Sequence, residues 1–480
     1  MKSQVLAAIA VLAACGDDGG APATPDAAVE PDAAIPAVCM PVWEAPAGCT
    51  ATDVVGKLGC IPGLTFRERP DQPLPGYVRY DLTFEQPIDH DRPELGTFPQ
   101  RAMLMLAAVD RPMVLATSGY NLSSRSRVDE LAAMFGANEL WYEHRFFVDS
   151  IPAAPADWSK LDIRQAAGDA HRLAAAFHWL FPGRWVNTGV SKGGMTSVSH
   201  RRFHPCDVDA TVAYVAPISL AAGDSAYNDF LSGVGGAARA TCRAELRAFQ
   251  RRLLQRRAEI VPLITGTFTQ LPIEQVYEMA VIELAFAMWQ YTSPDDPAHG
   301  CAAIPPDTAT PDQMLAFLSY HSSPDMLAGD ASLTFYRPYY HQAAGQLGFP
   351  APFEAGLEDL LQYPGTDVAA TFLPPGTAPT YDAAVMPEVR DWVTTKGERM
   401  MFVYGEFDPW STRMYEPAAA RDSVRYIDPA GSHGAKLRTL EPADRAAATA
   451  KLEGWLATPA LPQPAQLRRP DDTEIERPRL

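Results

Sequence analysis

The stretch VNTGVSKGGMTSVSHRRFHP, residues 186–205, carries the pattern Gly-x-Ser-x-Gly around Ser191. A run typical of a buried β-strand ends at Thr188, and a helix-like run follows Gly194. Between a strand and a helix, this pattern indicates a nucleophile elbow, a tight turn that holds a serine hydroxyl exposed at the end of the strand. The alternative is a glycine-rich turn with a capping serine. We predict that Ser191 is a nucleophile.

Apolar runs on both sides of this stretch predict strands that alternate with helices. The runs that resemble buried strands are residues 101–109, 112–118, 139–147, 184–190, 209–219, 399–406 and 423–428. Apolar residues recur at helical spacing over 159–181 and 441–456. This alternation predicts the α/β class, with a mostly parallel sheet covered on both faces.

Residues 220–395 interrupt the alternation. They contain long helical patterns separated by loops rich in Pro, Gly and aromatic residues. We predict a helical cap inserted into the core, which is then split into residues 39–219 and 396–480. Loops and caps over the strand ends of such a core are where substrate selection usually takes place.

The N-terminus has the features of an export signal. Lys2 precedes an apolar run from Val5 to Ala14, which is too short to span a bilayer as a helix and is typical of a signal peptide. The run ends Leu-Ala-Ala-Cys, which resembles a bacterial lipobox, so residues 1–15 predict a lipid anchor on Cys15. Ordinary secretory cleavage near Ala14 is the alternative.

Residues 16–38 are rich in Ala, Pro, Asp and Gly and contain no Lys or Arg. Such a segment buries too little apolar surface to offset the entropy of ordering, so we predict a flexible acidic tether. The formal net charge of the chain is −18. This charge disfavours nucleic acid and anionic lipid as partners, and we expect membrane contact only through the anchor.

Export from the cytoplasm, which the N-terminus predicts, would allow the cysteines to form disulfides. Besides Cys15 there are Cys39, Cys49, Cys60, Cys206, Cys242 and Cys301. An even number of cysteines outside the cytoplasm predicts three disulfides, and the sequence does not choose among the possible pairings.

A serine nucleophile needs a base, and the base needs a group that orients it. In this class of fold the acid and then the histidine follow the serine along the chain. Asp408 and His433 each lie just past a predicted strand, where active-site loops gather. The other acids near these strand ends are Glu406, Asp422 and Asp428. The other histidines well beyond Ser191, all in the predicted cap, are His299, His321 and His341.

An oxyanion hole requires two N–H donors. We expect one from the backbone of Lys192, directly after the nucleophile. The second should come from the segment ATSGYNL, residues 116–122, near Tyr120. An ordinary turn is the alternative for this segment.

His200 and His204 form an H-x-x-x-H pattern that suggests a metal site. The segment lacks the glutamate of zinc peptidases, and the sequence offers no evident third ligand. Packing or surface roles are the expected alternative. We predict no metal and no cofactor.

Seven motifs occur in the order found in a known family. They are FEQPIDHDRPELGTFPQR (84–101), SGYNL (118–122), YEHRFF (142–147), TGVSKGGMTSVSHRRFHP (188–205), FAMWQY (286–291), GEFDPW (405–410) and GSHG (431–434). Over roughly residues 65–460 the chain resembles the bacterial secreted tripeptidyl aminopeptidase family of serine peptidases, which includes prolyl tri/tetrapeptidyl aminopeptidases. It is more distantly similar to prolyl carboxypeptidases and dipeptidyl peptidases.

The resemblance implies an α/β-hydrolase core, a helical cap and a Ser-Asp-His triad. Its triad falls on Ser191, Asp408 and His433, the residues already selected by motif and chain order. In the YEHRFF motif, we expect Glu143 and Arg145 to form a buried ion pair that supports the site, rather than to take part in the chemistry. The lipobox departs from the freely secreted pattern of the family, so we expect a protein that is either anchored to a bacterial membrane or secreted.

An aminopeptidase must hold the free N-terminal ammonium of its peptide substrate, and a carboxylate in a partly dry pocket does this. The candidates in the cap are Asp224, Asp229, Glu278 and Glu283. The resembling block favours Glu283, for which a solvated helix-face charge is the alternative. Aromatic residues available to stack on a proline ring are Trp289, Tyr291, Trp410, Tyr339 and Tyr340, with core packing as their alternative.

Together with this resemblance, the sequence predicts an extracytoplasmic serine peptidase. It should release tri- or tetrapeptides, after proline, from free N-termini through an acyl-enzyme formed by the Ser-His-Asp triad. Two other functions stay open. A carboxylic-ester hydrolase would use the same triad on the same fold. A surface-anchored binding protein with an inactive hydrolase fold would lack a working triad.

Overall fold

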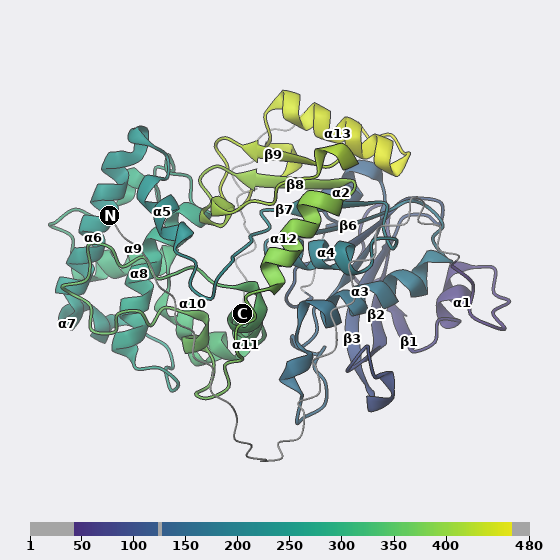
Figure 1. The fold of residues 1–480 in the computed structure, drawn as a ribbon, viewed down its shortest axis with the longest axis horizontal. Helices are drawn as coiled ribbons and strands as arrows, with labels where there is room; N and C mark the ends of the chain where they lie inside the picture. Colours follow the sequence, from purple (N-terminus) through teal and green to yellow (C-terminus); the bar gives the residue numbers. More distant parts are fainter. Residues whose placement is uncertain (1–42, 123–126, 463–480) are drawn as a thin grey trace, which may run out of the picture.

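The computed structural model describes residues 43–122 and 127–462, so the predicted signal peptide, Cys15, the tether and Cys39 lie outside the described residues. The described part forms a nine-stranded sheet in the order β1-β2-β3-β5-β4-β6-β7-β8-β9 (Figure 1). The strands are β1 (Leu64–Glu68), β2 (Val78–Pro87), β3 (Thr97–Leu106), β4 (Met113–Thr117), β5 (Asn138–Tyr142), β6 (Trp185–Val190), β7 (Ala210–Tyr214), β8 (Met400–Gly405) and β9 (Val424–Asp428). Pairing is antiparallel from β1 to β5 in the sheet order and parallel from β5 to β9.

The predicted α/β class is confirmed, and the seven predicted strands correspond to β3 through β9. The antiparallel strands β1 and β2 were not predicted. In β2, buried residues alternate with half-buried or exposed ones from Tyr80 to Gln86, because this part of the sheet is covered less completely than the parallel part. A search for continuous apolar runs does not detect such a strand.

Helices cover both faces of the sheet, and alternate strand residues point to opposite faces. Val114 packs with α2 (Glu130–Phe135) and α13 (Pro442–Leu456) in one cluster. Its neighbour Leu115 packs with α3 (Ile163–His178) and α1 (Val54–Gly59) in another. Beside them, α4 (Lys192–Phe203) and α12 (Val385–Lys396) cover Phe402 of β8.

The chain between β7 and β8 forms a group of helices at one end of the molecule, seen at the left in Figure 1. These helices are α5 (Ala226–Gly233), α6 (Ala240–Gln255), α7 (Arg257–Ile260), α8 (Ile273–Tyr291), α9 (Pro311–His321), α10 (Pro324–Ala328) and α11 (Asp330–Gln342). They have an apolar core of their own, in which Leu284 of α8 packs with Leu246 and Phe317. In contrast, α12 packs on the sheet side, although the prediction assigned residues up to 395 to the cap.

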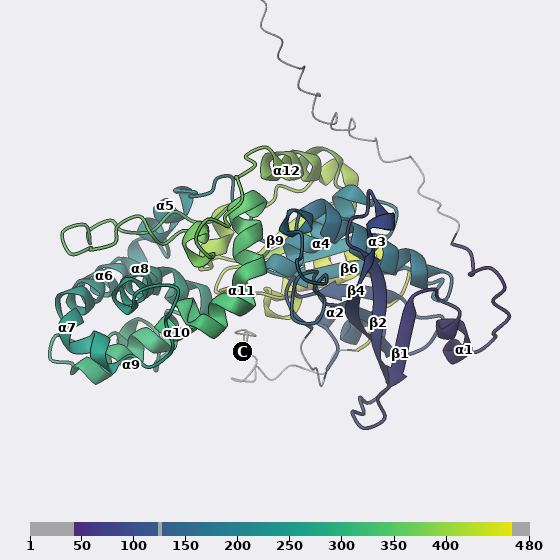
Figure 2. The ribbon, with the colours of Figure 1, turned by 90° about the horizontal axis from the view of Figure 1, so that it is seen from below.

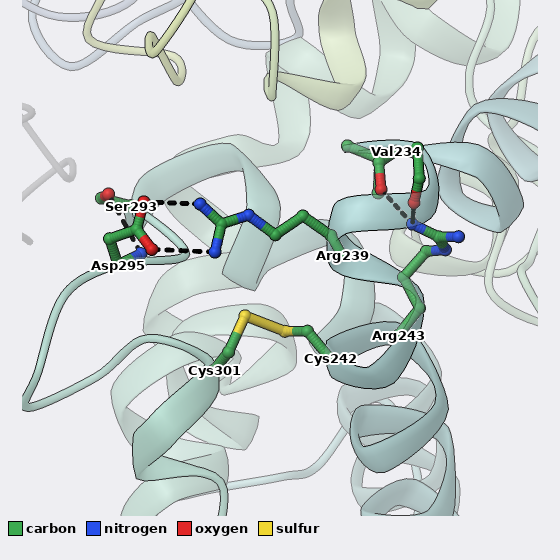
Figure 3. The surroundings of a disulfide bond; sticks show 8 residues. Val234, Arg239, Cys242, Arg243, Ser293, Asp295 and Cys301 are labelled. Atoms are coloured by element: carbon green, nitrogen blue, oxygen red, sulfur yellow. Dashed lines mark hydrogen bonds and ion pairs between the residues drawn. A yellow bond between two sulfur atoms is a disulfide. The ribbon is translucent and has the colours of Figure 1, made fainter.

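A disulfide between Cys242 and Cys301 ties α6 to the segment after α8 (Figure 3). Beside it, Arg239 makes a two-pronged ion pair with Asp295, with Nη1···Oδ1 and Nη2···Oδ2 distances of 2.8 and 2.5 Å. A second disulfide joins Cys49 and Cys60 around α1.

Cys206 is disulfide-bonded too. Disulfides are consistent with an extracytoplasmic location. Across residues 43–122 and 127–462, no helix has both the length and the apolar character needed to cross a bilayer.

Candidate active site

Ser191 stands between β6 and α4 in a backbone conformation that few residues adopt. Its φ and ψ are 56° and −124°, in the sparsely populated half of the map that non-glycine residues avoid. Two hydrogen bonds hold it there: Ser191 N donates to Tyr214 O of β7 at 2.9 Å, and Met195 N donates to Ser191 O at 3.0 Å. At Gly193 a Cβ atom would overlap Thr117 O, so only glycine lets α4 approach β4 this closely.

Asp408 and His433 meet at the ends of the neighbouring strands β8 and β9. Asp408 is buried, and its Oδ2 lies 2.7 Å from His433 Nδ1. Its Oδ1 accepts the N–H of Trp410 at 3.1 Å, which fixes the carboxylate. The backbone N–H of His433 donates to Gln290 O of α8 at 2.8 Å. With Nδ1–H donated to the carboxylate, Nε2 of His433 keeps its lone pair.

The competing acid Glu406 is exposed to solvent. Asp422 bonds elsewhere, to Lys451 and to Trp455 Nε1 at 2.5 Å each. Asp428 accepts the N–H of Ala430 in its own turn. None of these three carboxylates is engaged with His433 among the described residues.

The segment after β4 lies against the start of α4, as the prediction for an oxyanion hole requires. Gly119 has a φ of +76°, and a Cβ atom there would lie 2.7 Å from Lys192 C. Lys192 is the first residue of α4, where the N–H has no intrahelical acceptor. The N–H of Tyr120, however, donates to Ser118 Oγ at 3.0 Å. The predicted second donor is therefore already engaged.

The side chain of Lys192 stabilises the same segment. Its Nζ donates to Gly119 O at 2.5 Å and lies 5.3 Å from the Tyr120 ring centre and 5.4 Å from that of Phe147. Burial lowers the pKa of this amine well below its ordinary value. Lys192 thus fastens the Gly119 turn to the nucleophile's helix.

Three of the four predicted ammonium-binding carboxylates are unsuitable. Asp224 accepts from Arg413 Nε at 2.7 Å. Glu278 accepts from Arg257 at 2.9 Å. Asp229 is exposed on α5. A carboxylate that already has a cation, or that faces bulk water, gains little from a substrate ammonium.

Glu283 on α8 is half-buried and interacts with the buried side chain of Asp367. Burial raises the pKa of Glu283, and burial together with the Glu283 charge raises the pKa of Asp367 well above its ordinary value. Two adjacent carboxyl groups cannot both ionise easily, so the raised pKa of Asp367 favours its protonated form beside Glu283. Neither carboxyl oxygen of Asp367 has a hydrogen-bond partner among the described residues. Within the described residues, neither group makes an ion pair with Lys or Arg. The pair is an anionic site with no cation.

The two predicted tryptophans pack mainly against other aromatic rings. Trp289 is buried in the helical core, with its ring centre 5.9 Å from that of Phe407. Trp410 is half-buried and meets Phe286 edge-on at 5.0 Å and Tyr227 at 5.5 Å. For Trp289, burial in the core favours the packing role that was the alternative.

The tyrosines link the Ser191 elbow to the carboxyl pair. Tyr291 meets the His433 ring edge-on at 6.0 Å. Tyr120 lies 5.9 Å from Tyr339 between ring centres. The pKa of Tyr339 is raised by burial, by the charge of Glu283 and by Tyr291. Of the predicted aromatic residues, Tyr340 instead stacks on a ring of its own core, that of Phe372, at 4.4 Å.

The expected ion pair between Glu143 and Arg145 is not what the structure contains. Arg145 pairs with Asp169 of α3 through Nε and Nη2, both at 2.7 Å. Glu143 accepts the N–H of Leu122 at 2.8 Å and the hydroxyl of Ser150 at 2.7 Å. Glu143 connects the segments that follow β4 and β5, whereas Arg145 connects the segment after β5 to α3 and to the backbone oxygens of Pro87 and Lys160.

Residues 47–471 match the family model of the PS-10 peptidase S37 family. The chain belongs to this family. It is 39% identical to a prolyl tri/tetrapeptidyl aminopeptidase of Streptomyces mobaraensis over 415 residues, 84% of this chain and 85% of the relative. The resemblance inferred from the seven motifs is thereby confirmed, and the protein is an S37 peptidase.

Solved structures also match this S37 peptidase. Proline iminopeptidase of Mycobacterium smegmatis is 14% identical, with a TM-score of 0.38, over 82% of this chain and 99% of that one. An α/β hydrolase of Novosphingobium aromaticivorans is 16% identical, with a TM-score of 0.31, over 82% of this chain and 98% of that one.

Sequence reasoning missed one acidic residue of the candidate site of the S37 peptidase. Asp367 lies in a loop just before the short turn Ala369–Phe372, in the segment PGTDVAA. Gly, Thr and Asp together read as an ordinary surface turn. Asp367 differs from such a turn residue only in its burial beside Glu283, and the residues around it in the sequence do not predict this burial.

Proposed function

We propose that this S37 peptidase releases tri- or tetrapeptides, after proline, from peptides with a free N-terminus, and that it acts outside the cytoplasm. The observation that carries the proposal is the pair of Glu283 and Asp367. A partly buried anionic site without a cation, linked by tyrosines to the His433 and Ser191 segments, suits a substrate ammonium. The length of the released peptide and the preference for proline are supported by the printed activity of the Streptomyces mobaraensis relative.

In the proposed mechanism, His433 Nε2 takes the hydroxyl proton of Ser191 while the serine oxygen attacks the scissile carbonyl. The resulting imidazolium is stabilised by Asp408, which supports this role through its 2.7 Å contact to Nδ1. His433 then protonates the leaving amine as the C–N bond breaks, leaving an acyl-enzyme. Water adds to the ester in the reverse sequence, and Ser191 regains its proton from His433.

The oxyanion of each tetrahedral intermediate needs preorganised donors. We propose the N–H of Lys192 as one of them. For the second, the N–H of Tyr120 becomes available when the Ser118 hydroxyl turns away from it. The contact of Lys192 Nζ with Gly119 O supports this assignment, because it keeps the two backbone segments at a fixed separation.

The N-terminal ammonium of the peptide binds to the ionised Glu283, beside the buried carboxyl group of Asp367. A fixed distance between this carboxylate and Ser191 then limits the length of the released peptide. Tyr291, Tyr339 and Trp410, all half-buried, provide faces on which a proline ring stacks.

A substrate series tests the proposed function. Chromogenic amides of Ala-Ala-Pro, Ala-Pro and N-acetylated Ala-Ala-Pro are compared with a short-chain ester, and Ser191→Ala is the control enzyme. We expect rapid, Ser191-dependent cleavage of the free-amine tripeptide and little cleavage of the acetylated one. Ester hydrolysis without amide cleavage would contradict the peptidase assignment, while Ser191-dependent turnover would still support a serine hydrolase.

We further propose that Cys15 carries a lipid anchor. The proposal is supported by the lipobox-like end of the apolar run and by disulfides in the described residues. Cys15→Ser should move the protein from the membrane fraction to the soluble fraction of the bacterial host. An unchanged distribution would leave ordinary secretion as the better account.

A further inference from the structure

Four histidines converge on Asp207, a buried residue in the turn between α4 and β7. His171 and His178 come from α3, and His200 and His204 come from the end of α4. Asp207 Oδ2 lies 2.9 Å from His171 Nδ1 and 2.8 Å from His200 Nε2. The backbone oxygen of Asp207 lies 2.7 Å from His178 Nε2. The helices α3 and α4 lie side by side in Figures 1 and 2.

Three of these side chains have the arrangement of a metal-binding group. One ligand atom each of His171, His204 and Asp207 lies within 4.8 Å of the other two. The ring of His204 donates or accepts no hydrogen bond among the described residues and stacks on that of His171, with ring centres 4.2 Å apart. Both histidines are partly exposed, so an ion has a path from solvent.

The surroundings favour a cation. The C-terminal end of α4, where His204 is the capping residue, has the negative end of the helix dipole. The buried Asp207 carboxylate supplies an oxygen ligand beside the His171 and His200 rings. Asn187 Nδ2, 3.0 Å from His200 Nδ1, orients the ring that supports Asp207.

We propose that His171, His204 and Asp207 bind a divalent transition-metal ion of the Zn²⁺ class. Two imidazoles and a carboxylate are ligands that Zn²⁺ prefers, with water completing the coordination. Binding replaces the hydrogen bond between His171 and Asp207 with bonds to the ion and turns the partly exposed His171 ring out of its stack. His200 becomes an outer partner of the carboxylate ligand.

The proposed ion is structural. Ser191 and His204 lie at opposite ends of α4, which at 1.5 Å per residue places them about 20 Å apart. The ion joins α3 to the end of α4 and to the chain that enters β7. Sequence reasoning considered His200 with His204 and found no third ligand. In the fold, His204 instead lies beside His171 and Asp207, and His200 contacts the Asp207 carboxylate without belonging to the group of three ligands.

Zinc binding by the untagged mature protein, stripped with a chelator, tests the proposal. Calorimetric titration with Zn²⁺ and elemental analysis after desalting should give one tight ion per chain. His204→Gln and His171→Ala should each weaken binding at least about tenfold. The melting temperature should rise with Zn²⁺ in the wild type and not in these variants, whose folding is checked by circular dichroism.

His299→Ala is the matched control. His299 is also partly exposed, also lies near a carboxylate, with Nδ1 3.6 Å from Asp296 Oδ1, and also stacks on a ring, that of Tyr320. Its loss should leave Zn²⁺ binding unchanged. The proposal is overturned if the wild type binds no zinc, or if His204→Gln binds it as tightly as the wild type. The structural role would be overturned if chelation abolished Ser191-dependent turnover while the circular dichroism spectrum and the melting temperature stayed unchanged.

Discussion

Glu283→Gln is the substitution that separates recognition of the substrate amine from the chemistry at Ser191. It removes the ionised group of the carboxyl pair and keeps its size. We expect kcat/KM for a free-amine Ala-Ala-Pro amide to fall about a hundredfold. With the N-acetylated substrate, which has no ammonium, the same variant should differ little from the wild type.

The magnitude follows from the environment of the pair. Glu283 is half-buried, Asp367 behind it is buried, and no Lys or Arg pairs with them among the described residues. A carboxylate and an ammonium about 4 Å apart attract by about 4 kcal/mol at an effective dielectric constant of about 20. Desolvation of the ammonium offsets part of this, which leaves about 3 kcal/mol. Since about 1.4 kcal/mol corresponds to a factor of ten, the loss is about a hundredfold.

Asp367→Asn is the matched variant. The amide keeps the size of the Asp367 side chain, and the negative charge of Glu283 remains. We expect a loss of less than about tenfold on the free-amine substrate, the size of one changed hydrogen bond. In steady-state assays of folded protein, Glu283→Gln would contradict binding of the substrate ammonium by Glu283 in either of two ways. It could lower kcat/KM equally for the free-amine and the acetylated substrates, or it could lower neither.

Three further measurements use substitutions in the triad, in the carboxyl pair and at a disulfide. Asp408→Asn should lower kcat about ten-thousandfold, because His433 loses the carboxylate that orients it. The control is Glu406→Gln, which changes an exposed side chain and should leave kcat unchanged. The raised pKa of Asp367 means that the folded state is stabilised when this carboxyl group is protonated and loses that stabilisation as pH rises. Asp367→Asn should therefore have a higher melting temperature than the wild type at pH 8. The difference between the two proteins should vanish towards pH 4. A pH-independent difference would contradict this cause. Replacing Cys242 and Cys301 by serine should lower the free energy of unfolding by about 4 kcal/mol for their separation of 59 residues, measured by urea denaturation; a negligible change would show that the crosslink does not restrict the unfolded chain.

The parts of the fold that sequence reasoning reached are those with strong local signals. Strands β4 and β6 are short apolar runs, and α3 has its apolar residues at helical spacing, with Asp162 capping its start through a 2.6 Å bond from Gln165 N. The turn at Ser191 depends on glycines only two residues away on either side. These signals are local because strand, helix and turn preferences act over a few neighbouring residues.

The strands β1 and β2 lacked such a signal. Tyr80, Leu82 and Phe84 bury one face of β2, while residues between them are half-buried or exposed. This alternation is weaker evidence for a strand than a continuous apolar run. Only the pairing with β3 shows that the segment is a strand of the sheet.

The sequence by itself determined the α/β class, the family, and the order in which Ser191, Asp408 and His433 occur. Tertiary structure alone decided which charged groups meet: Glu283 with Asp367, Arg145 with Asp169, and His171 with Asp207. The physical reason is that an ionisable side chain takes its partner from whatever the packing of distant elements brings within a few ångströms. The pattern of apolar residues along the chain predicts how each segment is buried, but it does not predict how close two distant segments lie in the fold.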